Sequence, residues 1–232
     1  MNPDEELAKG IRQNVHTEDS GVAFVQGAGN QHNHVTQNYF STDSSLPNDP
    51  ETWYRQGEMK LQALEYAEAE LFLLAAAEAG HVEAMKRLAG IYSLTARGKS
   101  AHWYLKLAEL GDVDAYTSLG GLVKYRLSLA NSPSERVPLV DEAIGWYRKA
   151  LDAGDEEAAI EIGLILYKES RYEEAIPYLE TAAELIKRDP DLDDEYFVDS
   201  KLKRARKAQE RQHRKAERQE EDGTRRRWWR GS

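Results

Sequence analysis

The chain has 232 residues, no cysteine and a formal net charge of −10. Without cysteine it cannot form disulfides, cysteine-based zinc sites or a thiolate nucleophile. Its longest apolar run, residues 71–77, is too short to span a membrane. The first ten residues are acidic and lack the apolar core of a secretory signal, so we expect a cytoplasmic protein.

Residues 1–46 are expected to form a flexible N-terminal arm. Within it, residues 21–40 are nearly uncharged and hold two β-prone stretches around a Gly-rich turn. Uncharged segments with Asn and Gln can stack in register through main-chain hydrogen bonds and amide ladders. The segment loosely resembles the RIP homotypic interaction motif and related bacterial amyloid-signalling motifs. Self-assembly would use Val25, Gln26, Gly27, Asn30 and Asn33. The alternatives are a disordered linker and a hairpin docked on the rest of the chain.

The segment from residue 47 to 190 is expected to be a repeat array of helices. Pro50 is well placed to begin the first helix, because its fixed φ suits the first helical position. The predicted helices cover residues 51–64, 66–79, 82–95, 99–110, 113–130, 136–153, 156–169 and 172–188. Short connections between them predict helical hairpins, about four in number.

One pattern recurs three times in this array. In each copy an aromatic residue stands eight residues before a glycine, and an alanine follows four residues after that glycine. The copies are Phe72 with Gly80, Trp103 with Gly111, and Trp146 with Gly154. The glycine is expected to end each helix in the left-handed conformation, while the aromatic ring packs in the core. Such internal self-similarity is typical of a stacked array.

The third copy carries the fullest version of the pattern, A-x-x-W-Y-x-K-A-x-x-x-G followed by A-x-x-x-x-G. It resembles Sel1-like repeats, a branch of the tetratricopeptide superfamily, over about residues 48–188. The matching residues are Ala143, Trp146, Tyr147, Lys149, Ala150, Gly154, Ala158 and Gly163. The resemblance implies an all-α, right-handed α-solenoid of about four helical hairpins. The glycine spacing widens after Gly111, which indicates an insertion near residues 127–140.

The function that we expect of such an array is non-enzymatic: a scaffold or adaptor that holds a protein or peptide on its concave face. That face should be lined by the side of each first helix that points away from the stack. These residues are Tyr54, Lys86, Thr117, Lys124, Tyr125, Ile160 and Tyr167. No residue spacing indicates a catalytic site, a bound metal, a cofactor or a small-molecule substrate.

Residues 191–232 are expected to form a capping helix, at about 195–221, and a basic C-terminal tail. The helix starts apolar, with Tyr196, Phe197, Val198 and Leu202, and its first turns should cover the end of the array. Residues 201–230 hold 13 Lys and Arg against 5 Asp and Glu, whereas the rest of the chain holds 18 against 36. A solvated tail is the simplest interpretation; nucleic acid or an anionic membrane is the alternative partner. A signalling protein of a bacterial conflict or defence system, assembling through residues 21–40, is the other functional alternative.

Overall fold

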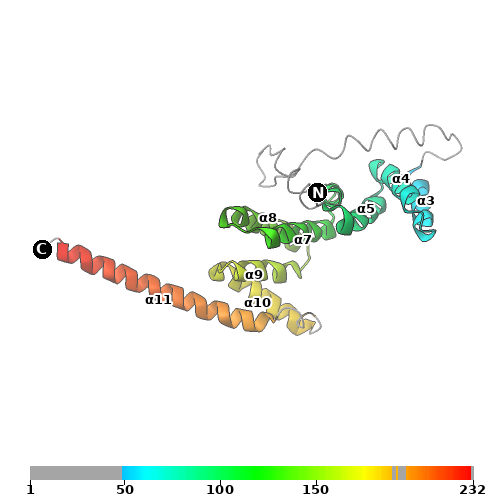
Figure 1. The fold of residues 1–232 in the computed structure, drawn as a ribbon. Coiled ribbons are helices and arrows are strands. Elements are labelled where there is room, and N and C mark those ends of the chain that lie inside the picture. Colours follow the sequence, from blue (N-terminus) through cyan, green and yellow to red (C-terminus); the bar gives the residue numbers. More distant parts are fainter. Residues whose placement is uncertain (1–48, 190–191, 193–196, 231–232) are drawn as a thin grey trace. The chain divides into compact units, whose positions relative to one another are not determined.

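The structure, a computed structural model, describes residues 49–189, 192 and 197–230, with side chains up to Glu221. These residues are mostly helical and contain no strand, which confirms the predicted all-α class (Figure 1). The helices are α3 (Pro50–Gln62), α4 (Tyr66–Glu78), α5 (Val82–Thr95), α6 (Arg97–Glu109), α7 (Val113–Leu129), α8 (Pro133–Asp152), α9 (Ala158–Lys168), α10 (Tyr172–Arg188) and α11 (Val198–Arg230). The predicted self-assembly segment, residues 21–40, lies outside the described residues.

Side chains before several helices satisfy the first free N–H groups. Asp49 accepts from the backbone N–H of Thr52 at 3.0 Å, and Asp112 accepts from that of Ala115 at 2.9 Å. Ser132 does the same for Glu135 at 3.3 Å. Because Asp and Ser hold their acceptor oxygen close to the backbone, they mark these helix starts already in the sequence.

The repeat glycines close three helices by the same hydrogen bond. Gly80, Gly111 and Gly154 have φ of 92°, 81° and 103°. After each, the next backbone N–H donates to a carbonyl five residues earlier: His81 to Ala76, Asp112 to Leu107 and Asp155 to Ala150, at 2.9–3.0 Å. This is the Schellman closure, which the left-handed residue permits. Leu64 and Ser170 take φ near 60° and close α3 and α9 in the same way, although they carry a Cβ.

The described chain divides into two compact units, one ending at Leu129 and one beginning at Ala130. In the first, α3 packs on α4 and α5 packs on α6 as hairpins, α4 contacts α5, and α7 packs on α6. Its core contains Leu73, Leu88, Trp103 and Leu107, all at most 4% exposed. Large apolar side chains spaced three or four residues apart form this core, as amphipathic helices require.

In the second unit α8 packs on α9, α9 and α10 form a hairpin, and α11 packs on α10 and also contacts α9. Val198, Leu202 and Ala205 of α11 are 0%, 7% and 0% exposed, so the first turns of α11 do cover this hairpin. The insertion predicted near residues 127–140 lengthens two helices, since α7 has 17 residues and α8 has 20. The expected third hairpin, α7 with α8, is divided between the two units.

Small residues set the closest helix approaches. A Cβ on Gly163 would lie 2.9 Å from Cδ2 of Leu179, and one on Gly57 would lie 2.7 Å from Cγ of Leu73. In both hairpins the leucine side chain therefore occupies the space that a larger residue would need. None of the described helices has a stretch long and apolar enough to cross a membrane.

Candidate protein-interaction surface

The residues expected to line a binding surface lie on α3, α5 and α7 of the first unit and on α9 of the second. Tyr54 on α3 is half-buried, and its ring stacks on that of His81, with centroids 4.6 Å apart and planes 23° apart. Nε2 of His81 lies 3.0 Å from a carboxylate oxygen of Glu51. Burial raises the pKa of the Tyr54 hydroxyl, and the carboxylate of Glu58 raises it further. Tyr54 is thus fixed by the residue that begins the next hairpin.

Lys86 on α5 is held by an ion pair with the residue before α7. Its Nζ lies 2.5 Å from Oδ2 of Asp112, and this contact raises the pKa of Lys86. The other carboxylate oxygen of Asp112 caps α7. One aspartate therefore both begins α7 and orients a cation of α5.

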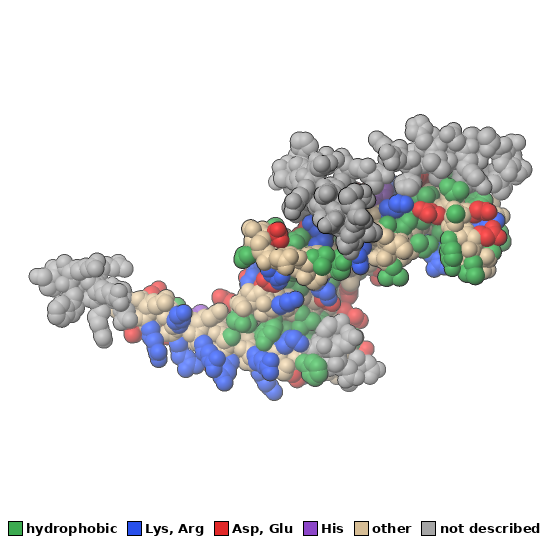
Figure 2. Space-filling view, viewed as in Figure 1, with side chains coloured by type: hydrophobic (Ala, Val, Ile, Leu, Met, Phe, Trp, Pro, Cys, Tyr) green, Lys and Arg blue, Asp and Glu red, His purple; other side chains and the backbone are tan. Residues whose placement is uncertain are grey.

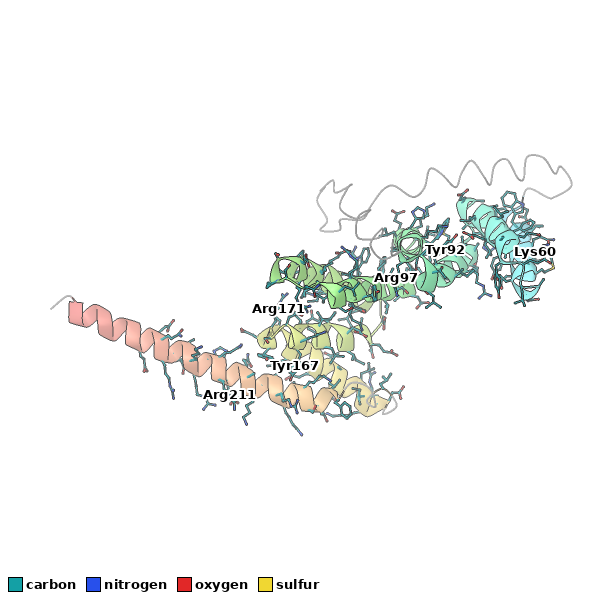
Figure 3. All side chains as sticks on the ribbon, in the orientation of Figure 1. Lys60, Tyr92, Arg97, Tyr167, Arg171 and Arg211 are labelled. Carbon is teal, nitrogen blue, oxygen red and sulfur yellow. The ribbon has the colours of Figure 1, made fainter. Side chains whose placement is uncertain are left out.

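Tyr125 on α7 carries a cation over its ring. The guanidinium carbon of Arg97, the first residue of α6, lies 3.8 Å from the ring centroid. Arg97 is labelled in Figure 3. A cation at this distance from a tyrosine face is attracted by the ring quadrupole. On the same helix Lys124 is exposed and Thr117 is half-buried. Sequence reasoning missed Arg97, because the contact joins residues of different helices.

In the second unit, Tyr167 on α9 is half-buried and its ring meets that of Tyr172 edge-on, with centroids 5.7 Å apart. Ile160, also on α9, is only 3% exposed, so the expectation that it is exposed was wrong. The reason is that α9 contacts α8, α10 and also α11, whereas α5 packs on α4 and α6. An additional neighbour leaves less of the circumference of α9 open than the offsets from α5 suggest.

The residues of the repeat pattern lie in the core and at the helix ends. Phe72, Trp103 and Trp146 are 8%, 4% and 4% exposed. A lysine three residues later lies over each tryptophan ring: Lys106 at 4.7 Å from the centroid of Trp103, and Lys149 at 4.3 Å from that of Trp146. The lysine of the repeat pattern therefore covers the outer face of the buried indole.

Ion pairs one repeat apart join helices at successive positions of the array. Glu58 binds Arg87 at 2.8 Å, Glu70 binds Lys99 at 3.4 Å, and Asp141 binds Arg171 at 2.7 Å. The partners are 29, 29 and 30 residues apart. Glu70 also accepts a hydrogen bond from the hydroxyl of Tyr92, whose pKa is raised by burial and by this contact. A search for opposite charges one repeat apart would have found these pairs in the sequence.

Three exposed apolar residues on α3 and α5 were also missed. Met59 is 51% exposed, Ile91 is 37% exposed and Leu94 is 87% exposed. Leu88 and Tyr92 are buried positions of α5. Ile91 lies between them and Leu94 lies beyond them, so the helical spacing could have identified both as outward-facing.

Among the described side chains, no group of three or more His, Asp or Glu residues is arranged to hold a metal ion. No protein-family model matches the chain. No curated protein matches it either. A solved structure is similar: a Sel1 repeat protein from Oxalobacter formigenes, at 22% identity and a TM-score of 0.44. The similarity covers 66% of this chain and 68% of that one.

Proposed function

We propose that the hairpins form a non-enzymatic scaffold that binds a protein or peptide on the first helices of the first unit. The observation that carries this proposal is that each of α3, α5 and α7 presents an aromatic or cationic side chain at the surface. Each is held in place by another element: Tyr54 by His81, Lys86 by Asp112, and Tyr125 by Arg97.

Ordered side chains of this kind favour binding for an energetic reason. Fixing a flexible side chain on association costs on the order of 0.5–1.5 kcal/mol, and side chains already fixed avoid part of that cost. Tyrosine and arginine are also the types that contribute most at protein interfaces. The exposed Met59, Ile91 and Leu94 add apolar area on two of the same helices.

The test replaces two of these aromatic residues together, Tyr54→Ala with Tyr125→Ala, in the full chain. The matched control is Tyr66→Ala with Tyr178→Ala, which removes two tyrosines from the second helices α4 and α10. Each form is used as bait in its native host, and recovered proteins are quantified. For a protein that the wild type recovers, the Kd is then measured with all three forms.

We expect the Tyr54/Tyr125 variant to weaken that Kd by at least about tenfold, which corresponds to about 1.4 kcal/mol. The control should bind like the wild type, and both variants should melt within a few degrees of each other. Equal binding by all three forms would place the partner elsewhere and refute this surface.

A further inference from the structure

Helix α11 has two sides of different chemistry. Val198, Leu202 and Ala205 lie on the buried side, spaced by four and three residues. The opposite side carries seven exposed cations, which we call the basic face. They are Lys203, Arg204, Lys207, Arg211, Arg214, Lys215 and Arg218. Figure 2 shows Lys and Arg side chains gathered along one edge of this helix, and Arg211 is labelled in Figure 3.

The acidic residues of the same stretch are kept mostly off this face. At about 100° of rotation per residue, the seven cations fall within roughly 60° of the direction of Arg218. Measured in the same way from Arg218, Glu210, Glu217 and Glu220 lie roughly 80°, 100° and 160° away. Glu221 lies at the edge of the basic face. Among the side chains that the structure describes, the ion pairs engage one residue of the basic face, Arg214, with Glu210 at 3.2 Å. Its positive charge is therefore largely uncompensated by the helix itself.

The remaining sides of α11 do not suit a membrane or an apolar protein groove. After Ala205 the positions that continue the buried side are Gln209, Gln212, Ala216 and Gln219. A helix that lies in a membrane interface needs an apolar face with large residues such as Leu, Phe or Trp. The described side chains from Gln209 to Glu221 provide none. Attraction to the partner must therefore come from charge.

We propose that the basic face of α11 binds the phosphate backbone of a DNA duplex without reading its sequence. The seven cations span about 15 residues, or about 22 Å of helix, with one or two of them on every turn. Duplex DNA presents a negative charge about every 1.7 Å along its axis, so several phosphates lie within reach of this length. Salt screens charge over about 10 Å at 0.1 M, so the local charge of α11 governs contact rather than the net charge of the chain.

The experiment measures binding of the full chain to a fluorescently labelled duplex of about 24 base pairs by anisotropy, over a salt series. If about four phosphates are contacted, Kd should rise about 150-fold between about 50 and 200 mM KCl. The variant R204Q/K207Q/R211Q/R218Q removes cations of the basic face and keeps good helix formers. It should weaken binding at low salt at least about 30-fold and flatten the salt dependence to about half its slope.

A matched variant, K149Q/K168Q/K187Q/R188Q, removes the same charge from exposed positions of α8, α9 and α10. It should bind DNA within about threefold of wild type, because these cations lie outside the basic face. Circular dichroism of both variants checks that helix content is unchanged. Equal losses of affinity in the two variants would mean that DNA binding depends only on the net charge of the protein, and would overturn the proposal.

Vesicles with phosphatidylserine are tested at the same protein concentration and salt. The proposal requires tighter binding to DNA than to the vesicles, because a row of cations is also attracted to anionic lipid. Tighter binding to the vesicles, or absence of DNA binding at about 50 mM KCl, would overturn it, since a backbone contact of this size is strongest at low salt. Sedimentation of both variants without DNA gives the last check. A change of oligomeric state confined to the basic-face variant would assign the face to a second copy of the chain, against the proposal.

Discussion

The hairpin helices and the exposed part of α11 use charge in opposite ways. In the hairpins, cations pair with carboxylates of the neighbouring repeat, as Arg87 does with Glu58 and Arg171 does with Asp141. On α11 the cations gather on one face, and the paired carboxylate of Arg214 comes from the same helix. Charge in the first region joins parts of the fold, whereas most of the positive charge in the second is left exposed. Stability should therefore depend on the hairpins, and α11 beyond Ala205 should contribute little to it.

The largest expected difference is between two aromatic residues, one in the hairpins and one directly before α11. Trp146 is 4% exposed, so Trp146→Ala leaves a cavity and should lower the free energy of unfolding by about 3–5 kcal/mol. Phe197, directly before α11, is 64% exposed, and Phe197→Ala should change the free energy of unfolding by at most about 0.5 kcal/mol. Urea unfolding followed by far-UV circular dichroism measures both. Similar losses for the two variants would contradict the assignment of Trp146 to the core.

How well the sequence predicted these regions depends on how local each feature is. The helix ends at Gly80, Gly111 and Gly154 are set by the residue itself, so the repeat pattern located them. Ile160 is buried on α9, which contacts α11 as well as α8 and α10, and no offset within the repeat contains α11. Arg97 over Tyr125 likewise depends on how α6 and α7 lie against each other. Local conformation was thus predictable, while contacts between helices required the fold.

Two kinds of glycine within the hairpins offer a smaller and sharper test. Gly163 is confined by Leu179, with 3.2 Å from its added Cβ to the backbone nitrogen, so Gly163→Ala should cost about 1–3 kcal/mol through crowding. Gly154 has open space but φ of 103°, so Gly154→Ala should cost about 1–2 kcal/mol through backbone strain.

Asparagine separates these two causes. It tolerates positive φ better than alanine, so Gly154→Asn should be less harmful than Gly154→Ala. It is larger than alanine, so Gly163→Asn should be more harmful than Gly163→Ala. The order of the four unfolding midpoints is the measurement. The same order at both sites would show that one of the two explanations is mistaken.

The smallest expected effect concerns the paired charges of the second unit in acid. Arg171 binds both carboxylate oxygens of Glu174, at 2.7 and 2.6 Å, and these hydrogen bonds lower the pKa of Glu174. A carboxylate whose pKa is lower in the folded state stabilises the fold above its unfolded pKa of about 4.3, and that stabilisation is lost as the pH falls through the folded pKa.

Wild type should therefore exceed Glu174→Gln in unfolding free energy at neutral pH, by less than about 1 kcal/mol because the pair is exposed to solvent. The difference should vanish in acid. Glu210→Gln, on the basic helix, should change the unfolding free energy at neutral pH by at most about 0.5 kcal/mol, because the side chains of Glu210 and Arg214 are both 66% exposed. Unfolding curves for the three proteins from neutral pH to about pH 3 test this, and a Glu174→Gln difference that stays constant with pH would rule out the ion pair as its source.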